Sequence, residues 1–273
     1  MKGLNKLLVF VIFLSIFALS GCSIVRVKNS KTDSWQRIEK TKKVVIGIDD
    51  SFVPMDFRQK DGKLVGYDVD LAKAVFKQYG IKPDFQTIDW TMNVTELRNQ
   101  TIDLIWNGFT ITPERAKVVR FSEPYLRNDQ VLVTKTDKNI KSVADMNDET
   151  LGAQSGSSGV QDLDQRPKIL KDRIKNKQPI LYDSFNNAFI DLNANRIQGL
   201  LIDSIYAKYY IAHQSDPRSY RIISSGMPSE QFAVGMRKQD KEVQRKINQG
   251  LNRLRKNGEL KKINHKWFGK NSQ

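Results

Sequence analysis

Short apolar runs alternate with amphipathic stretches along most of the chain. Residues 44–48 form a continuous run of apolar residues and one glycine, which is typical of a strand buried on both faces. After Asp68, apolar residues recur on one helical face as far as Tyr79, and Gly80 marks the end. Further strands are expected at 85–88 and 102–106, and a helix at 92–99. This order predicts right-handed crossovers and a mostly parallel sheet.

The same alternation returns in a second unit. The expected strands and helices follow one another as 151–154, 159–165, 181–182, 186–195, 199–202 and 204–214. A strand at 131–134 precedes this unit, and a run at 232–236 follows it. Two closing amphipathic stretches, 241–255 and 259–267, have no sheet of their own, so we expect them to return to the first unit. The chain would then cross twice, near 124–130 and 227–233.

These patterns predict an α/β fold of two lobes, each a mostly parallel sheet with flanking helices, joined by a two-strand hinge. We assign 42–126 and 230–269 to lobe 1, and 127–229 to lobe 2.

The N-terminus carries an export signal. The apolar run 7–19 follows Lys2 and Lys6 and is shorter than the ~20 residues that a spanning helix needs. We therefore interpret 1–21 as a signal peptide. Cys22 is the one cysteine of the chain, and residues 19–22 (LSGC) resemble a bacterial lipobox, in which the cysteine carries diacylglycerol. We expect a lipid anchor at Cys22 on the extracytoplasmic face of the cell membrane and a polar tether over 22–41; an incidental cysteine is the alternative.

Charge adds little to this interpretation. The formal net charge is +15, but the basic residues are spread along the chain and no basic stripe is interleaved with aromatic residues. We expect no nucleic acid partner and a basic surface facing anionic lipid or wall polymer. We also expect a monomer.

Catalytic chemistry is poorly supported. The chain has two histidines, His213 and His265, no H-x-x-x-H spacing, and no glycine-rich phosphate motif. We expect no metal, no cofactor and no enzymatic activity.

Binding residues follow the strands instead. Ligands of open α/β sheets lie beyond the carboxyl ends of the strands. The residues at those ends are Asp49, Asp50, Phe52, Trp90, Asn107, Gly108, Thr110, Arg115, Gln154, Ser157, Ser158 and Asp203.

The chemistry of this set suits an α-amino acid. Arg115 offers a planar fork for a carboxylate, the Ser/Gly turn at 155–159 offers backbone N–H groups, and Asp203 suits an ammonium group. Phe52 and Trp90 offer apolar walls. Each residue also has a plain alternative: an exposed arginine at a helix start, an Asp203 that only caps a helix, core aromatics and a simple connecting loop.

Four spaced motifs resemble one family. They are residues 66–72 (GYDVDLA), 108–115 (GFTITPER), 121–125 (FSEPY) and 266–269 (KWFG). Together they resemble the polar amino acid-binding proteins of ABC importers, of the glutamine-binding and lysine/arginine/ornithine-binding types, over about residues 42–269. The resemblance implies a two-lobed periplasmic-binding-protein-like fold (type II) that closes on one amino acid and delivers it to permease and ATPase subunits.

The resemblance also implies roles. Arg115, Thr110 and the Ser157-Ser158 loop would take the α-carboxylate, and Asp203 with the Gly108 carbonyl the α-amine. Asp49 would read the ligand side chain between Phe52 and Trp90.

Two departures limit that transfer. The glutamine-binding type has lysine at Gln154 and histidine at Ile202, and Asp50 adds a second carboxylate beside Asp49. We prefer glutamine or an arginine- or lysine-like ligand. A cystine-binding importer component, a cyclohexadienyl dehydratase-like enzyme, and a sensor or adhesin stay open.

Overall fold

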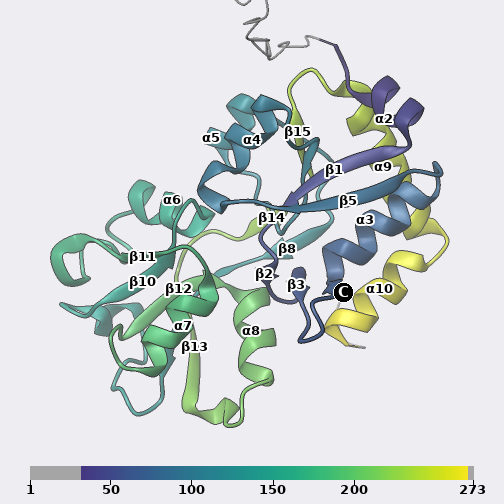
Figure 1. Cartoon of the computed structure of the whole chain (residues 1–273). Helices are drawn as coiled ribbons and strands as arrows, with labels where there is room; N and C mark the ends of the chain where they lie inside the picture. Colours follow the sequence, from purple (N-terminus) through teal and green to yellow (C-terminus); the bar gives the residue numbers. More distant parts are fainter. Residues whose placement is uncertain (1–31, 270–273) are drawn as a thin grey trace, which may run out of the picture. The chain divides into compact units, whose positions relative to one another are not determined.

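The computed structural model describes residues 32–269. The predicted signal peptide, the predicted anchor at Cys22 and the first part of the predicted tether lie outside the described residues. Within the described part, no helix is both long and apolar enough to cross a bilayer. Two five-stranded sheets with flanking helices make up this part of the chain (Figure 1).

The first sheet forms lobe 1. Its strand order is β5 (Lys82–Thr87), β1 (Lys43–Ile48), β6 (Leu104–Ile105), β15 (Gly235–Arg237), β7 (Val119–Phe121). β1 is parallel to β5 and β6, whereas β15 is antiparallel to β6 and β7. The helices of this lobe are α3 (Tyr67–Lys77), α4 (Asn93–Asn99), α5 (Pro113–Val118), α9 (Lys241–Lys256) and α10 (Glu259–Phe268).

The second sheet forms lobe 2 with the same order of strands. It runs β11 (Ile180–Tyr182), β10 (Leu151–Gln154), β12 (Gly199–Asp203), β9 (Gln130–Lys135), β13 (Tyr220–Ser224). β11, β10 and β12 are parallel, and β9 is antiparallel to β12 and β13. Its helices are α6 (Ser158–Gln165), α7 (Phe185–Asn193) and α8 (Ser204–Ala212). The mostly parallel sheets are therefore confirmed, with one antiparallel strand inserted in each.

Two strands connect the lobes, as the sequence predicted. β8 (Leu126–Asn128) pairs antiparallel with β14 (Glu230–Phe232), and Asn128 lies opposite Glu230. The predicted strand at 232–236 is split, because the chain leaves the hinge after Phe232 and joins the first sheet at Gly235. Both crossings thus lie side by side.

One prediction for the tether is wrong. Residues 35–41 form helix α2 (Trp35–Thr41), with Trp35 and Ile38 buried in lobe 1. The Trp35 ring packs edge-on against Tyr79 at 5.2 Å between centroids, and Ser34 donates to Asp240. Two apolar residues three positions apart gave too weak a period to predict a helix, but their burial holds it.

Several short elements complete the described chain. They are β2 (Ser51–Phe52), β3 (Asp56–Arg58) and β4 (Leu64–Val65), which form a small sheet, and the 3₁₀ turns η1 (Trp90–Met92), η2 (Val143–Met146), η3 (Lys175–Lys177) and η4 (Pro217–Ser219).

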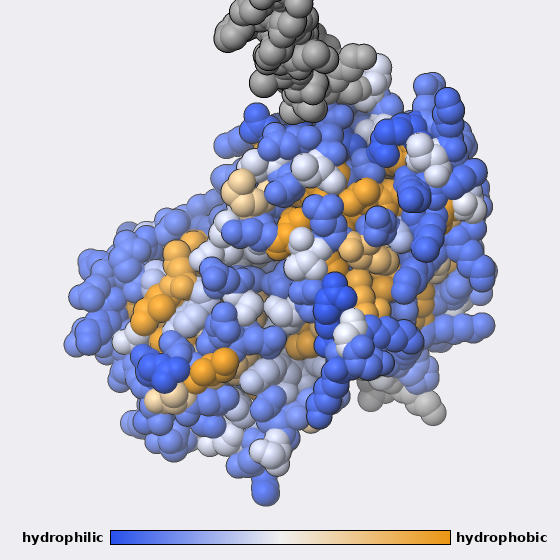
Figure 2. All heavy atoms as spheres, in the orientation of Figure 1, coloured by the Kyte–Doolittle hydropathy of each residue, from blue (hydrophilic) through white to orange (hydrophobic). Residues whose placement is uncertain are grey.

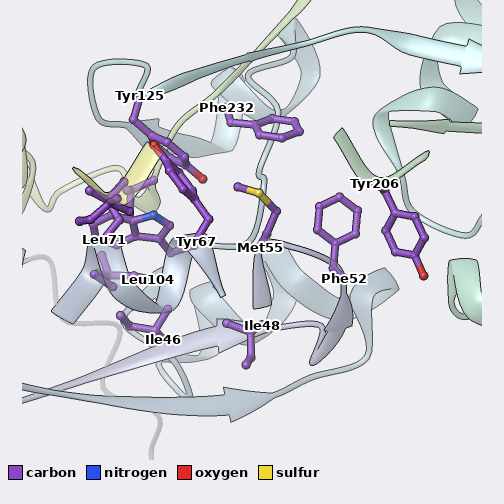
Figure 3. Packing of buried hydrophobic residues seen from close by; sticks show 14 of the residues in the cluster. Ile46, Ile48, Phe52, Met55, Tyr67, Leu71, Leu104, Tyr125, Tyr206 and Phe232 are labelled. Carbon is purple, nitrogen blue, oxygen red and sulfur yellow. The ribbon is translucent and has the colours of Figure 1, made fainter. Parts of the chain in front are cut away.

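The core extends from lobe 1 across to lobe 2. Figure 3 shows Phe52 of β2 between Met55 and Tyr206, the last of which belongs to α8. The Phe52 and Tyr206 ring centroids are 5.5 Å apart. On the face seen in Figure 2, hydrophilic side chains cover most of the surface and apolar ones show in separate patches. The lobes therefore touch through an apolar contact at the small sheet.

Candidate ligand-binding site

One cavity collects the predicted residues. It lies where the carboxyl ends of the parallel strands of both lobes face each other. Eleven residues line it: Asp49, Phe52, Trp90, Asn107, Gly108, Thr110, Arg115, Gln154, Ser157, Ser158 and Asp203. Its free volume is about 10 Å³, room for at most about one water molecule, so the lobes are closed on each other here.

Arg115 is a buried group rather than an exposed arginine at a helix start. α5 begins at Pro113, and the Thr112 hydroxyl accepts from the Arg115 N–H at 3.2 Å, which fixes the first turn. The side chain turns into the cavity and is 5% exposed. Its Nη1 donates to the Thr110 carbonyl at 3.0 Å, and its Nη2 donates across the cleft to the Gly156 carbonyl at 3.1 Å. Burial lowers the pKa of Arg115 to about 10, so it stays charged at neutral pH.

Asp203 does not cap the helix that follows it. It ends β12 and precedes α8, but its carboxylate accepts no capping hydrogen bond. The side chain is 6% exposed and accepts instead from Asn128 and from Gln130 Nε2, the latter at 3.1 Å. Burial, and then the charge of Glu230, raises the pKa of Asp203 to about 8. The cavity thus has a buried cation on lobe 1 and a buried carboxyl group on lobe 2.

Three residues around Asp203, namely Asn128, Gln130 and Glu230, were not predicted from the sequence. Glu230 accepts from Thr110 at 3.3 Å, from Asn128 at 2.9 Å and from Gln130 at 3.1 Å. None of them lies in a recognisable motif. The one feature of the sequence that could have indicated them is that these polar residues lie within the two predicted crossings, 124–130 and 227–233.

The far end of the cavity pairs a carboxylate with an amide. Gln154 Nε2 donates across the cleft to Asp49 Oδ2 at 2.9 Å and also to the Asp183 carbonyl at 3.1 Å. Burial raises the pKa of Asp49. Asp50, expected beside it, lies outside this cavity, because its carboxylate is bound by Arg58 and by Thr87.

The aromatic residues serve both as core and as walls. Trp90 meets Phe109 edge-on at 5.9 Å, and the Arg115 guanidinium carbon lies 4.3 Å from the centroid of the Phe109 ring. Phe52 packs against Phe185 of lobe 2 at 5.9 Å. Phe52 and Trp90 therefore belong to the buried core and also line the cavity.

Two buried carboxyl groups fix the floor of the cavity. Asn107 Nδ2 donates to Asp56 Oδ2 at 2.7 Å, and the Gly108 N–H donates to Asp68 Oδ2 at 2.7 Å. Gly108 has φ +55°, and a Cβ there would lie 2.9 Å from the Phe52 ring, so this position requires glycine. Burial raises the pKa of Asp68 to about 7 and that of Asp56 well above its usual value.

The serine-rich turn is held in place by lobe 1. Ser157 caps α6 by accepting from the Val160 N–H at 3.3 Å, and Ser158 Oγ donates to Thr110 Oγ1 across the cleft at 3.2 Å. Gly156 has φ +71°, and a Cβ there would lie 3.1 Å from Thr91 Cα. The backbone of this turn therefore lies close to Thr91 of lobe 1.

Over residues 32–269, no group of three or more His, Cys, Asp or Glu side chains could hold an ion.

Comparison with known proteins decides the family. The bacterial extracellular solute-binding proteins, family 3, match residues 44–270. The chain belongs to this family. The arginine-binding extracellular protein ArtP of Bacillus subtilis is 30% identical over 96% of this chain and 97% of its own length.

Two solved structures extend this comparison. An ABC uptake transporter substrate-binding protein from Streptococcus pneumoniae, with bound histidine, is 47% identical, covers 88% of this family 3 protein and 98% of its own chain, and has a TM-score of 0.87. A polar amino acid ABC uptake transporter substrate-binding protein from Streptococcus thermophilus is 50% identical, covers 92% and 94%, and has a TM-score of 0.57. These relatives are solute-binding proteins rather than enzymes, and they share the two-lobed fold.

Proposed function

We propose that this protein captures one polar α-amino acid outside the cytoplasm and delivers it to the permease and ATPase of an ABC importer. The observation that carries the proposal is the pair of Arg115 and Asp203. The two side chains are buried, come from opposite lobes and line one cavity. A zwitterion supplies the opposite charge to each of them, which a neutral or singly charged solute does not.

The head of the amino acid would bind first to these two residues. The guanidinium of Arg115, with Thr110 and the turn at Ser157 and Ser158, would hold the α-carboxylate. The carboxylate of Asp203 and the Gly108 carbonyl would accept hydrogen bonds from the α-ammonium. Because Arg115 already spans the cleft to Gly156, the same residue links ligand and closure.

The side chain of the amino acid would lie toward Asp49 and Gln154, between Phe52 and Trp90. A carboxylate and an amide at this end favour a side chain that donates hydrogen bonds, whether amide or cationic. Histidine, arginine and glutamine are therefore the first candidates, and cystine is the runner-up.

Loading would require a hinge motion. The cavity in the closed form is too small for an amino acid, and the cross-cleft bonds Gln154 to Asp49 and Ser158 to Thr110 must open to admit one. The ligand then shifts the population toward the closed form through its contacts to both lobes.

The anchor is the finer part of the proposal. Cys22, once acylated, would hold a monomeric receptor at the outer face of the membrane with residues 23–32 as the remaining tether. Replacing Cys22 by serine is expected to abolish palmitate labelling and to release the protein from the membrane fraction. A membrane-bound C22S variant would contradict this.

A thermal-shift panel followed by calorimetry tests the proposed function. Histidine, arginine, glutamine, lysine and cystine are added one at a time, and a ligand at 100 times its Kd should stabilise the protein by ~2.7 kcal/mol. Failure of all of them to stabilise it would contradict the proposal. Incubation with cyclic prephenate-like acids, expected to give no product, addresses the dehydratase alternative. Loss of amino acid uptake on deletion distinguishes an importer component from a sensor or adhesin.

A further inference from the structure

Two buried carboxylates at the lobe 2 side of the cavity share the same two amide donors. Asp203 Oδ1 and Glu230 Oε2 both accept from Asn128 Nδ2 and from Gln130 Nε2. The Gln130 nitrogen lies 3.1 Å from each carboxylate oxygen, and the Asn128 nitrogen lies 2.9 Å from that of Glu230. An amide nitrogen carries two protons, so each amide can serve both carboxylates at once. The shared donors therefore hold the two carboxylates next to each other.

This pair would persist when the cleft opens. Asp203 ends β12 and Gln130 begins β9, and these neighbouring strands pair Asp203 with Gln130 directly. Asn128 and Glu230 face each other in the hinge strands. Only the Thr110 hydroxyl, at 3.3 Å from Glu230, belongs to lobe 1. The arrangement is thus a property of lobe 2 and the hinge rather than of closure.

The charges around the pair do not balance. Asp203 is 6% exposed and Glu230 is 8% exposed. Arg115 is the buried cation that faces them, and it also donates to the carbonyls of Thr110 and Gly156. Two carboxylates therefore stand against one guanidinium, in a place where water screens little.

The outer side of Glu230 does not correct this imbalance. Glu230 also borders a larger cavity of about 300 Å³, whose charged lining residues are Arg127, Asp162 and Arg166. Arg166 is paired with Asp162 on the same helix, and Arg127 is exposed to solvent. Burial raises the pKa of Asp162, and the charge of Glu230 adds to this effect. One of these arginines is thus paired with a carboxylate and the other is exposed, so neither is a buried, unpaired cation beside Glu230.

Neighbouring carboxylates in such a site do not both ionise easily. In line with this geometry, burial and the charge of Glu230 raise the pKa of Asp203 to about 8.

We propose that Glu230 is a positioning residue of the amino acid site: it makes the Asp203–Glu230 pair hold one proton, which the ligand's ammonium group displaces on binding. The inference rests on the proposed function. The O–H bond of the protonated carboxyl breaks, the electron pair stays on the oxygen, and the proton passes to the buffer. The ammonium then donates hydrogen bonds to Asp203, while Glu230 keeps the amide donors of Asn128 and Gln130.

A linked proton makes affinity depend on pH. While the pair is protonated in the free protein, full linkage of one proton makes Kd about tenfold weaker for each unit by which pH falls. The dependence flattens above the pKa of the pair. If Glu230 only held neighbouring side chains in place, Kd would not depend on pH in this way.

The test is calorimetry of the purified mature chain with arginine or glutamine, whose side chains do not change protonation between pH 6 and 8, at about pH 6, 7 and 8. Each titration is repeated in phosphate and in Tris, because their different ionisation enthalpies report the number of protons released. The wild type is expected to release close to one proton at pH 6 and 7, and to bind about tenfold more weakly at pH 6 than at pH 7.

Glu230→Gln is the decisive variant. It keeps an oxygen that can accept from Asn128 and Gln130 but removes the charge, so proton release should fall by at least half and the pH profile should flatten. Glu39→Gln is the matched control, because Glu39 is an exposed residue of α2 and does not line the cavity. It should behave as the wild type.

Each remaining outcome overturns the inference in a different way. A wild type that releases no proton in any buffer contradicts it without any variant. Glu230→Gln with unchanged proton release, or with affinity lowered by the same factor at each pH, gives Glu230 a structural role only. Absence of binding by histidine, arginine and glutamine alike would overturn the proposed function itself, and the inference with it.

Discussion

Removal of the Arg115 guanidinium should weaken amino acid binding strongly while leaving the fold intact. The side chain is 5% exposed, and its two terminal nitrogens hold carbonyls of lobe 1 and lobe 2 at 3.0 and 3.1 Å. Its loss would leave the ligand's carboxylate in a buried place without a cation, and it would remove one bond across the cleft. Truncating one partner of a buried, hydrogen-bonded charge pair costs about 2–5 kcal/mol, which is about 30-fold to several thousand-fold in Kd.

The assay is a calorimetric titration of Arg115→Ala and Arg115→Lys with the best ligand of the panel. Lysine keeps the charge but lacks the planar fork, so Arg115→Lys should lose less affinity than Arg115→Ala. Arg98→Ala, at an exposed position on α4, is the control and should bind as the wild type. An Arg115→Ala protein with unchanged thermal stability and unchanged Kd would refute the assignment of Arg115.

Three further predictions concern other parts of the site. Asp49→Asn should lower the affinity for arginine more than for glutamine, because only a cationic side chain gains from the charge; equal losses in competition titrations would contradict this. Gly156→Val should weaken binding of every amino acid by a similar factor, since a side chain there meets Thr91 across the cleft; a change in ligand ranking alone would count against it. The free energy of unfolding should fall as pH rises from about 5 to about 8, because folded Asp68, with its pKa raised to about 7, holds a proton that the unfolded chain has released. Each such group gives a slope of up to about 1.4 kcal/mol per pH unit. An equal or higher unfolding free energy at pH 8, measured by urea denaturation, would contradict this.

The residues that line the cavity could be predicted because the rule that places ligands beyond the carboxyl ends of strands depends only on the order and direction of the strands. Carboxyl ends of parallel strands meet at one edge, so residues that follow separate strands, such as Asp49, Asn107 and Asp203, were expected together before any side chain was placed. The rule could not decide whether each residue has a binding role or only a structural one. The burial of Arg115 and the missing cap at Asp203 depend on side-chain packing, which has no local period.

The residues that escaped prediction share a different cause. Asn128 and Glu230 are 102 positions apart, and only the pairing of the two hinge strands brings them together. Helix α2 depends on two apolar side chains filling lobe 1, a tertiary effect that its short period does not reveal. Asp50 follows a strand like its neighbours, but the small sheet turns it toward Arg58 instead of the cavity. In each case the deciding contact is long-range.

A crystal structure of the protein with bound histidine would show which side chains hold the amino acid. The α-carboxylate is expected against the Arg115 guanidinium and the α-ammonium against Asp203, with the imidazole directed toward Asp49 and Gln154. Histidine bound elsewhere, or bound in this cavity with both ends of its zwitterion away from those two side chains, would contradict it.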